Sequence, residues 1–365
     1  MKNKQKSKKE KRVNISSAKL KKLLARKDNE QKLHEALSTV PKITNETVSE
    51  HREEVLGKAR KYIYPLKHSK THFVRLTISL SVVAVVAFFV FCVLDIYKFQ
   101  STSAFIYRVS EVVPFPVAKA GSDYVSYYNY LFELRRNMHY YSTQQQANFS
   151  TKSGQTQLDS LKKQAMNDVI TLSYTKQLAR KHHVYVSQQD VNSALDLVKA
   201  ENRLGTSNAE LASVLKDYWG WTENDFKQEL KQELLEQKVV AVMDSTTNNL
   251  AQSVYQKVIH GGNFSALAGQ YSQDPSTKSN GGQYPETITP STTNIAPQVM
   301  QELYKLKVNQ VSPIINTGYS LEILKVLSRH QNQITAAHIQ FNYSPITQFT
   351  NKLEKKSPPK QFISF

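Results

Sequence analysis

Few residues of this 365-residue chain could do chemistry by themselves. The single cysteine, Cys92, excludes an internal disulfide framework and any cysteine-based metal site. Because Cys92 lies in the most apolar run of the chain, a buried small hydrophobic residue is favoured over a reactive thiol. His182–His183 has the side chains of a metal-ligand pair, but adjacent residues on a helix or strand point apart. We interpret the pair as an ordinary helix end and expect no metal and no cofactor.

The polar stretch YSQDPSTKSNGGQYPE, residues 271–286, has the composition of either a long surface loop or the rim of a site. Asp274 and Ser276 can bond nearby backbone N–H groups in an Asx-type turn around the intervening proline. Gly281 and Gly282 permit the positive φ angles that a reversal of the chain requires. The segments around the stretch decide between the two interpretations.

Helices are predicted on both sides of this stretch, and strands after it. Before it, apolar residues recur at helical spacing, and Gly261–Gly262 ends the first helix. After it, helical spacing continues to about Asn309, and two apolar strands follow, VSPII (311–315) and YSLEILKVLS (319–328). The stretch therefore connects helices to a small sheet.

Three sequence blocks around the stretch resemble the parvulin-type peptidyl-prolyl isomerase domain, also called PpiC or rotamase. The blocks are GGNFSALAGQYSQDPSTKSNGG, LYKLKVNQVSPI and LEILKV, in this order and at matching separations. The resemblance implies an α+β domain over residues 246–341, with a four-stranded antiparallel sheet covered by helices.

The first strand of that family, which carries a histidine in the pattern S/A-x-H-I-L, is missing from its usual place. The fitting segment comes last, as ITAAHIQF (334–341). We expect a circular permutation in which a hairpin pairs residues 320–328 with 334–341 through a five-residue loop. The alternative is that residues 334–341 open a second, truncated parvulin repeat.

The resemblance also implies candidate catalytic residues. His338 fits the first-strand histidine if the permutation holds, Glu322 falls where the family has its last-strand histidine, and Gln283 replaces an acid or thiol. An isomerase lowers a rotation barrier near ~18–20 kcal/mol by binding the twisted amide beside a tuned polar network. Glu322 and His338 on facing strands could form such a network, or His338 could be a sheet histidine without chemistry.

The family's proline-binding pocket falls on Ile295, Val299 and Leu303. These side chains keep the pocket apolar but remove its aromatic floor. The departures from the family pattern leave it open whether the chain is an active isomerase or a peptide-binding relative.

Residues 98–245 are predicted to be a helical module. Ser207 with Glu210 makes a capping box, and Thr222 with Asp225 places an acid in the first turn of a helix. The segments ARKHHVYVSQQDVNSAL and YWGWTENDFKQELKQELLEQKVV resemble the all-α N-terminal module of SurA- and PrsA-type extracytoplasmic folding factors. The resemblance implies a module that binds unfolded polypeptide.

The run LTISLSVVAVVAFFVFCVL, residues 76–94, carries no charge and would be a helix about 28 Å long, close to the roughly 30 Å hydrocarbon core of a bilayer. We predict a transmembrane helix over residues 73–97. A buried helix of a soluble domain and a cleaved signal peptide are the alternatives, and the 75 residues that precede the run disfavour the signal peptide.

The charge of the chain is concentrated before this helix. Residues 1–75 carry about 21 Lys/Arg and 8 Asp/Glu, a large part of the net charge of +18. The positive-inside rule therefore makes residues 1–72 a basic cytoplasmic tail and places the rest of the chain outside. The simplest interpretation of the tail is a disordered segment near anionic lipid headgroups. Nucleic-acid binding is disfavoured because no stacking aromatic residue accompanies the charge before Tyr62.

Together these features predict a single-pass, membrane-anchored folding factor of the peptidyl-prolyl isomerase family, acting outside the cytoplasm on unfolded or proline-containing secreted and membrane proteins. A non-catalytic chaperone and a single-partner scaffold are the alternatives. Residues 342–365 are expected to be a flexible tail.

Overall fold

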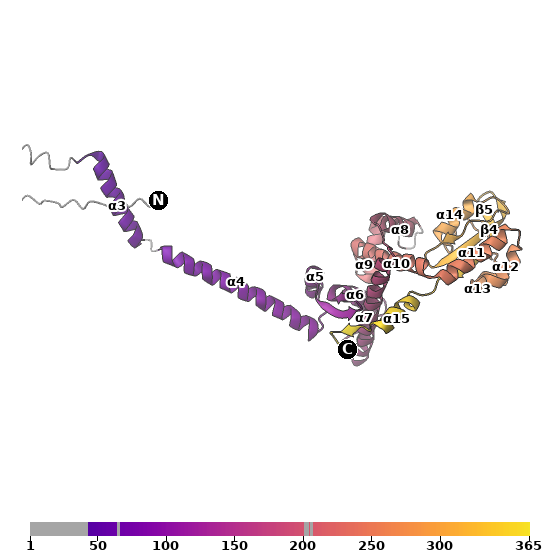
Figure 1. Cartoon of the computed structure of the whole chain (residues 1–365), viewed down its shortest axis with the longest axis horizontal. Helices are drawn as coiled ribbons and strands as arrows, with labels where there is room; N and C mark the ends of the chain where they lie inside the picture. The colour runs from indigo at the N-terminus through magenta and orange to yellow at the C-terminus, as the bar shows by residue number, and fades with distance from the viewer. Residues whose placement is uncertain (1–42, 64–65, 201–203, 205–206) are drawn as a thin grey trace, which may run out of the picture. The chain divides into compact units, whose positions relative to one another are not determined.

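The residues that the computed structural model describes (Figure 1) are 43–63, 66–200, 204 and 207–365. The chain divides into two compact units, Met1–Ala87 and Phe88–Phe365, and each is described by itself.

The first unit contains helix α3 (Asn45–Ile63). The helix starts after Thr44, whose Oγ1 accepts a hydrogen bond from the Thr47 N–H at 3.3 Å. Further along the helix, Glu54 forms an ion pair of 2.6 Å with Lys58, which lies one turn after it. The expectation of a disordered tail is therefore wrong for this segment. Residues 1–42 of the expected tail lie outside the described residues.

Helix α4 (Leu66–Tyr97) contains the apolar run and crosses the boundary between the two units. The most apolar 18-residue window of Thr71–Tyr97 has a mean hydropathy of 2.8, and only 6% of that window is buried. Among the described residues, α4 is the one helix that is both long enough and apolar enough to cross a membrane. Its exposed apolar side chains are the opposite of what a core helix of a soluble domain presents.

The second unit begins with a helical module. Its elements are α5 (Ala104–Val112), β1 (Pro116–Ala120), β2 (Asp123–Ser126), α6 (Tyr127–Thr143), α7 (Lys152–Lys181), α8 (Gln188–Ala200), α9 (Asn208–Trp219) and α10 (Glu223–Met243). Ser207 forms the predicted capping box with Glu210, and Thr222 forms one with Asp225, which was predicted only as an acid in the first turn. The expectation of an all-α module is wrong, because β1 and β2 form an antiparallel pair within it.

The core of this module starts inside α4, before residue 98. Cys92 and Ile96 are fully buried in the same apolar cluster as Ile106, Val117 and Tyr127. The last turns of the apolar helix are thus part of the module and not a linker to it.

The segment after residue 342 also belongs to this module. Helix α15 (Thr347–Lys356) packs on α7 (Figure 1), and strand β6 (Lys360–Gln361) pairs antiparallel with β1. Ile363 is buried in the module core, and Phe365 stacks on Tyr130 with ring centroids 5.8 Å apart. The expectation of a flexible tail is wrong, because apolar residues along this segment are buried against parts of the module that are far away in the sequence.

Between α10 and α15 lies the parvulin-like region. Its elements are α11 (Ser245–Ile259), α12 (Phe264–Tyr271), α13 (Pro275–Lys278), α14 (Pro297–Lys305), β3 (Ile315–Asn316), β4 (Ser320–His330) and β5 (Gln333–Asn342). The sheet order is β3-β4-β5, and β4 pairs antiparallel with β5 over most of their length. The expected hairpin between residues 320–328 and 334–341 is present, but the expected five-residue loop is wrong, because the pairing continues to His330 and Gln333 and leaves a loop of two residues, 331–332.

The sheet has three strands, so the expectation of four is wrong. Residues 282–288 run along the free edge of β5 but meet it only through single bridges, at Gln283 and Ile288. Gly281 and Gly282 have positive φ, and Pro285 carries no N–H. A continuous ladder cannot form along this segment for both reasons.

Each face of the β4–β5 hairpin is covered by helices. Alternation along β4 puts Leu321 and Ile323 against α11 and α12, and Leu324 and Val326 against α14. His338 is paired with Leu324 across the ladder, so its side chain lies on the face covered by α14.

Candidate functional site

The polar stretch after α12 is folded onto strand β5. Asp274 caps the short helix α13, where its Oδ1 accepts hydrogen bonds from the Ser276 N–H at 3.0 Å and the Ser276 hydroxyl at 2.7 Å. Gly282 then passes so close to β5 that a Cβ atom on it would lie 2.2 Å from the His338 carbonyl oxygen. Glycine is therefore required here, and the turn presses the stretch against His338.

His338 is the centre of a buried polar network. Its Nδ1 lies 2.9 Å from Glu322 Oε2, which comes from the diagonal position on β4. Only 3% of His338 and 7% of Glu322 is exposed. The sequence-predicted contact between Glu322 and His338 is thus formed.

The other ring nitrogen of His338 is occupied as well. Nε2 lies 2.9 Å from Asp274 Oδ2 and 2.9 Å from the Thr277 hydroxyl, which also donates to Asp274 Oδ2 at 2.7 Å. One imidazole therefore connects β4, β5 and the cap of α13.

An aromatic ring covers this network. Tyr284 stacks on His338 with ring centroids 4.4 Å apart and an interplanar angle of 29°. Its hydroxyl donates to Glu322 Oε2 at 3.5 Å, and burial raises its pKa. The stacked ring excludes water from one side of the imidazole.

The network favours the charged forms of its members. Burial alone would raise the pKa of Asp274, but hydrogen bonds from Thr277, Ser276 and His338 lower it to about 2. Burial alone would lower the pKa of His338, but the hydrogen bonds and charges of Glu322 and Asp274 raise it. The arrangement is an imidazole held between two carboxyl groups, with the pKa of His338 raised above its ordinary value.

This geometry limits what His338 can do. Both ring nitrogens are engaged and the ring is covered, so His338 has no free atom with which to attack or deprotonate a bound polypeptide. It can fix the positions of α13 and the two strands, which makes it a positioning residue.

The other sequence-predicted residues are placed differently. Gln283 bridges to Ala337 through its backbone at the edge of β5, directly before Tyr284. Val299 and Leu303 are fully buried in the core between α14 and the sheet, and Ile295 is half-buried beside them. In this structure Val299 and Leu303 pack in the core, and only Ile295 is partly open to a ligand.

Three members of the network were not predicted as site residues: Asp274, Thr277 and Tyr284. The sequence signal for Asp274 was read as a local turn, which it is, while its second carboxylate oxygen serves His338. The hydroxyl of Thr277 and the ring of Tyr284 carried no sequence signal beyond their places in the polar stretch.

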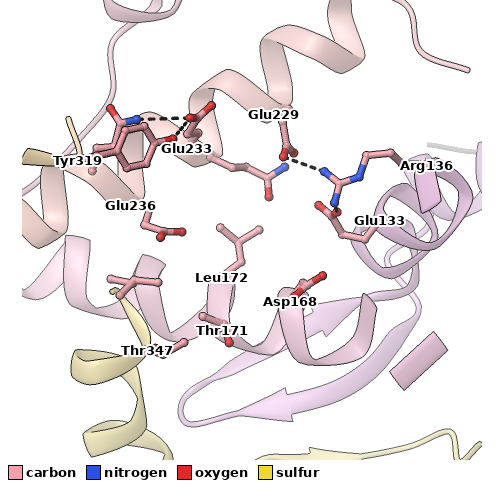
Figure 2. Close-up of a pocket in the computed structure, with 13 residues that line it drawn as sticks. Glu133, Arg136, Asp168, Thr171, Leu172, Glu229, Glu233, Glu236, Tyr319 and Thr347 are labelled. Carbon is pink, nitrogen blue, oxygen red and sulfur yellow. Dashed lines mark hydrogen bonds and ion pairs between the residues drawn. The ribbon is translucent and has the colours of Figure 1, made fainter. Parts of the chain in front are cut away.

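A second feature of the unit is an acidic cleft of ≈ 440 Å³ (Figure 2). Its carboxylates come from α6, α7 and α10 and are Glu133, Asp168, Glu229, Glu233 and Glu236. Among the described residues that line it, Arg136 is the only basic one, and it pairs with Glu133 at 2.7 Å and Glu229 at 2.9 Å.

The surroundings of the acidic cleft disfavour the ionised form of several of its carboxyl groups. Burial raises the pKa of Glu133 to about 7, against the lowering effect of Arg136 and with a further rise from Glu229 and Asp168. Burial likewise raises the pKa values of Glu229, Asp168 and Glu236.

The turn between β3 and β4 reaches the rim of this cleft. The Tyr319 hydroxyl donates to Glu233, which also accepts from Gln237 (Figure 2). Gly318 has a positive φ, and a Cβ atom on it would lie 2.5 Å from the Gln237 side chain. No pattern in the sequence indicates that the two regions meet here.

The remaining histidine pair is a helix end, as we interpreted it. The His182 N–H bonds to the Leu178 carbonyl at the end of α7, and His183 has a positive φ of 56°. In the part of the chain that the structure describes, no cluster of three or more His, Cys, Asp or Glu side chains could hold a metal ion.

Comparison with known families matches both regions of the second unit. Residues 67–240 match the SurA-like N-terminal domain, and residues 234–328 match the PPIC-type PPIase domain. The second match ends before strand β5 begins.

Individual relatives are similar over parts of the chain. A parvulin-like PPIase of Rickettsia prowazekii is 38% identical over 79 residues, which is 22% of this chain and 28% of the relative. The foldase protein PrsA of Caldanaerobacter subterraneus is 26% identical over 189 residues, 47% of this chain and 58% of the relative. The alignments thus span less than two thirds of these relatives' lengths.

A crystal structure of foldase protein PrsA from Streptococcus pneumoniae aligns with 53% of this chain and 76% of its own chain. The sequence identity is 16% and the TM-score 0.17, too low to support a structural argument.

Proposed function

The chain is a SurA/PrsA-like protein with a PPIC-type PPIase domain, and from this premise we propose that it is a protein-folding factor. In this proposal the helical module binds unfolded segments of secreted or membrane proteins, and the parvulin-like domain binds and isomerises their prolyl bonds. The clients are polypeptides, and no cofactor takes part.

The observation that carries the proposal is the buried His338 network in the parvulin-like domain. Rotation about a prolyl bond needs no proton transfer; it needs an environment that favours the twisted amide over the planar one. A network that fixes β4, β5 and α13 in advance supplies such a preorganised surface. His338, Glu322 and Asp274 position this surface and do not touch the reacting atoms.

The decisive experiment is a prolyl cis–trans isomerisation assay with a short Xaa-Pro peptide and the full chain in detergent micelles. The full chain is needed because Cys92 and Ile96 belong to the module core, which a fragment starting at residue 98 would lack. We expect acceleration, and a loss of about tenfold in kcat/KM for His338→Gln, equivalent to ~1.4 kcal/mol of transition-state stabilisation.

The matched control is His330→Gln, the same substitution at an exposed histidine on β4. It should leave the rate unchanged. An unaltered rate for His338→Gln, or no acceleration by a chain with an intact near-UV circular dichroism spectrum, would contradict the isomerase proposal.

A non-catalytic chaperone is the second candidate, because both nitrogens of His338 are occupied and the ring is buried. It predicts suppressed aggregation of an unfolded client without acceleration of the isomerisation. A scaffold that docks one partner predicts neither effect.

We further infer that β5 takes the place of the family's first strand, as the circular permutation requires. The antiparallel pairing of β5 with β4 and the end of the PPIC-type match at residue 328 support this inference. Moving residues 333–342 in front of Ser245 through a Gly/Ser linker should then preserve cooperative unfolding. Loss of the fold in that variant would favour the truncated-repeat alternative.

We also propose that α4 spans the cell membrane with residues 1–72 in the cytoplasm and the second unit outside. The exposed apolar surface of α4 and the basic residues before it support this orientation. Protease added to intact spheroplasts should remove the second unit and spare the N-terminal segment. The reverse pattern would contradict the orientation.

A further inference from the structure

The last turns of α4 are part of the helical module. Cys92 and Ile96 are fully buried in the module core, and the Tyr97 hydroxyl donates to the Pro116 carbonyl at 2.7 Å. No free linker separates the apolar helix from the module. If α4 spans a bilayer, as proposed above, the module is held directly against the bilayer surface.

Helix α5 follows this junction and has one face that is buried against the module and a second, apolar face that is exposed. Ile106 and Ser110 are buried against the module. Phe105 and Val112, seven residues apart and therefore on one face of the helix, are 52% and 81% exposed. Two apolar side chains that face away from the core call for a partner surface.

The contacts of Phe105 place this second face at membrane depth. Its ring lies 6.4 Å from the ring of Phe88 and 6.4 Å from that of Phe91, both on α4. The uncharged run ends at Leu94, so these two residues lie about 9 and 4.5 Å below its end at 1.5 Å per residue. Helices that lie in a membrane interface bury their apolar face by about 5–10 Å.

The charges beside this face suit phospholipid headgroups. Lys98 and Arg108 are exposed, Glu111 pairs with Arg108 at 3.3 Å on the surface, and the partly exposed Asp95 precedes Lys98 in the last turn of α4. Exposed pairs of this kind exchange readily with phosphate. Phe99, which is 68% exposed and follows Lys98, adds a third exposed apolar side chain.

We propose that α5 lies in the bilayer interface, with Phe99, Phe105 and Val112 in the lipid and Lys98 and Arg108 at the headgroups. The occupant of this surface is a phospholipid bilayer. The inference rests on the proposed membrane span and adds to it a second contact, which docks the helical module flat on the membrane.

The test uses the full chain reconstituted in vesicles of neutral and anionic phospholipid. Val112→Cys is labelled with the fluorophore NBD, and the wild-type chain, whose Cys92 is fully buried, gives the labelling background. We expect roughly a twofold loss of fluorescence when the lipids carry bromine in their acyl chains, because interfacial helices sit at that depth. Tyr185→Cys, at an exposed apolar position before α8, is the matched control and should not be quenched.

Alkaline carbonate extraction of the same vesicles separates this inference from the membrane span. Quenching of the label supports the interfacial helix whether or not the chain resists extraction, and extraction of a quenched chain would overturn the span alone. An unquenched label overturns the interfacial helix, including the case in which the label is shielded from water by a second copy of the chain. An unquenched label on an extracted chain overturns both.

Discussion

The His338 network and the acidic cleft are two clusters of buried charge in one unit, and they solve the same problem differently. Around His338, two carboxylates share one cation, and hydroxyl and N–H donors supply the rest of their hydrogen bonds. In the cleft, five carboxylates line a space in which Arg136 is the one basic residue among those that the structure describes. The pKa of Asp274 falls to about 2, whereas that of Glu133 rises to about 7.

Local donors set the two clusters apart, and burial adds to the difference, because 9% of the Glu133 side chain is exposed against 17% of the Asp274 side chain. Asp274 receives three short hydrogen bonds from residues within its own turn, so its charge is satisfied before the sheet is complete. Glu133 depends on Arg136 from its own helix and faces other carboxylates across the cleft. In the first cluster the charged form of Asp274 is stabilised by its neighbours. In the second cluster the charged form of Glu133 is destabilised by its surroundings.

The largest effect is expected for Arg136→Met. It leaves Glu133 and Glu229 buried without their cation, which should lower the free energy of unfolding by about 3–5 kcal/mol at pH 8. The loss should shrink at pH 5.5, where these acids can be protonated. Urea unfolding of the full chain in detergent at both pH values measures it, with Arg180→Met, whose partner Asp123 is at the surface, as the control. An equal loss of unfolding free energy at both pH values would show that the substitution acts through lost packing and not through the lost charge.

His338→Gln should have the next largest effect. Removing the shared cation leaves Asp274 and Glu322 facing each other, at a cost of about 2–4 kcal/mol near pH 5.5. Adding Glu322→Gln should recover part of this loss, since one of the two charges is then gone. A double-mutant cycle measured by denaturant unfolding gives the coupling, and strict additivity would contradict a shared network.

Glu133→Gln tests the sign of the cleft's pH dependence. Because the folded-state pKa of Glu133 is raised to about 7, the folded chain holds a proton that the unfolded chain releases above its ordinary pKa of 4.5. Stability from this group is complete at low pH and is lost as the pH rises to 7. The substitution should therefore reduce the loss of stability between pH 5 and 8 by about 2 kcal/mol. The exposed Glu286→Gln should leave the pH profile of the wild type unchanged.

Asp274→Asn should show the opposite sign and a smaller effect. The lowered pKa of Asp274 contributes stability above the ordinary value of 3.8 that is lost as the pH falls through about 2. Relative to wild type, the variant should lose about 1–2 kcal/mol at pH 6 and nothing at pH 2. Thermal unfolding across this range measures it. A difference that persists at pH 2 would mean that the cap of α13 matters more than the charge.

Local sequence patterns predicted much of the parvulin-like region. The hairpin of β4 and β5 follows from two apolar strands joined by a short loop, and alternation then places Glu322 and His338 on one face. The capping box at Ser207 was predicted because it is complete within four residues, whereas the one that Asp225 forms with Thr222 was predicted only as an acid in the first turn.

What the sequence did not predict depends on contacts between distant segments. Arg136 on α6 and Glu229 on α10 come together only in the folded chain, and neither helix has a sequence pattern that predicts contact with the other. The fourth strand was expected from the family pattern, but single bridges at Gln283 and Ile288 replace it. Tyr284 became a member of the network because Gly282 brings the backbone against β5, a contact visible only in three dimensions.

The strand order β2-β1-β6 has a consequence for how the chain folds as it is made. Sheet hydrogen bonds join Phe362 to Val117, and the Gln100 side chain bonds to the Ser364 carbonyl 264 positions later. The region from α11 to β5 has its own core and can fold as soon as it emerges. The helical module must wait for residues 360–364, because loop-closing contacts at such separations form late. During synthesis the parvulin-like domain would thus be complete while the module that encloses it in sequence is still open.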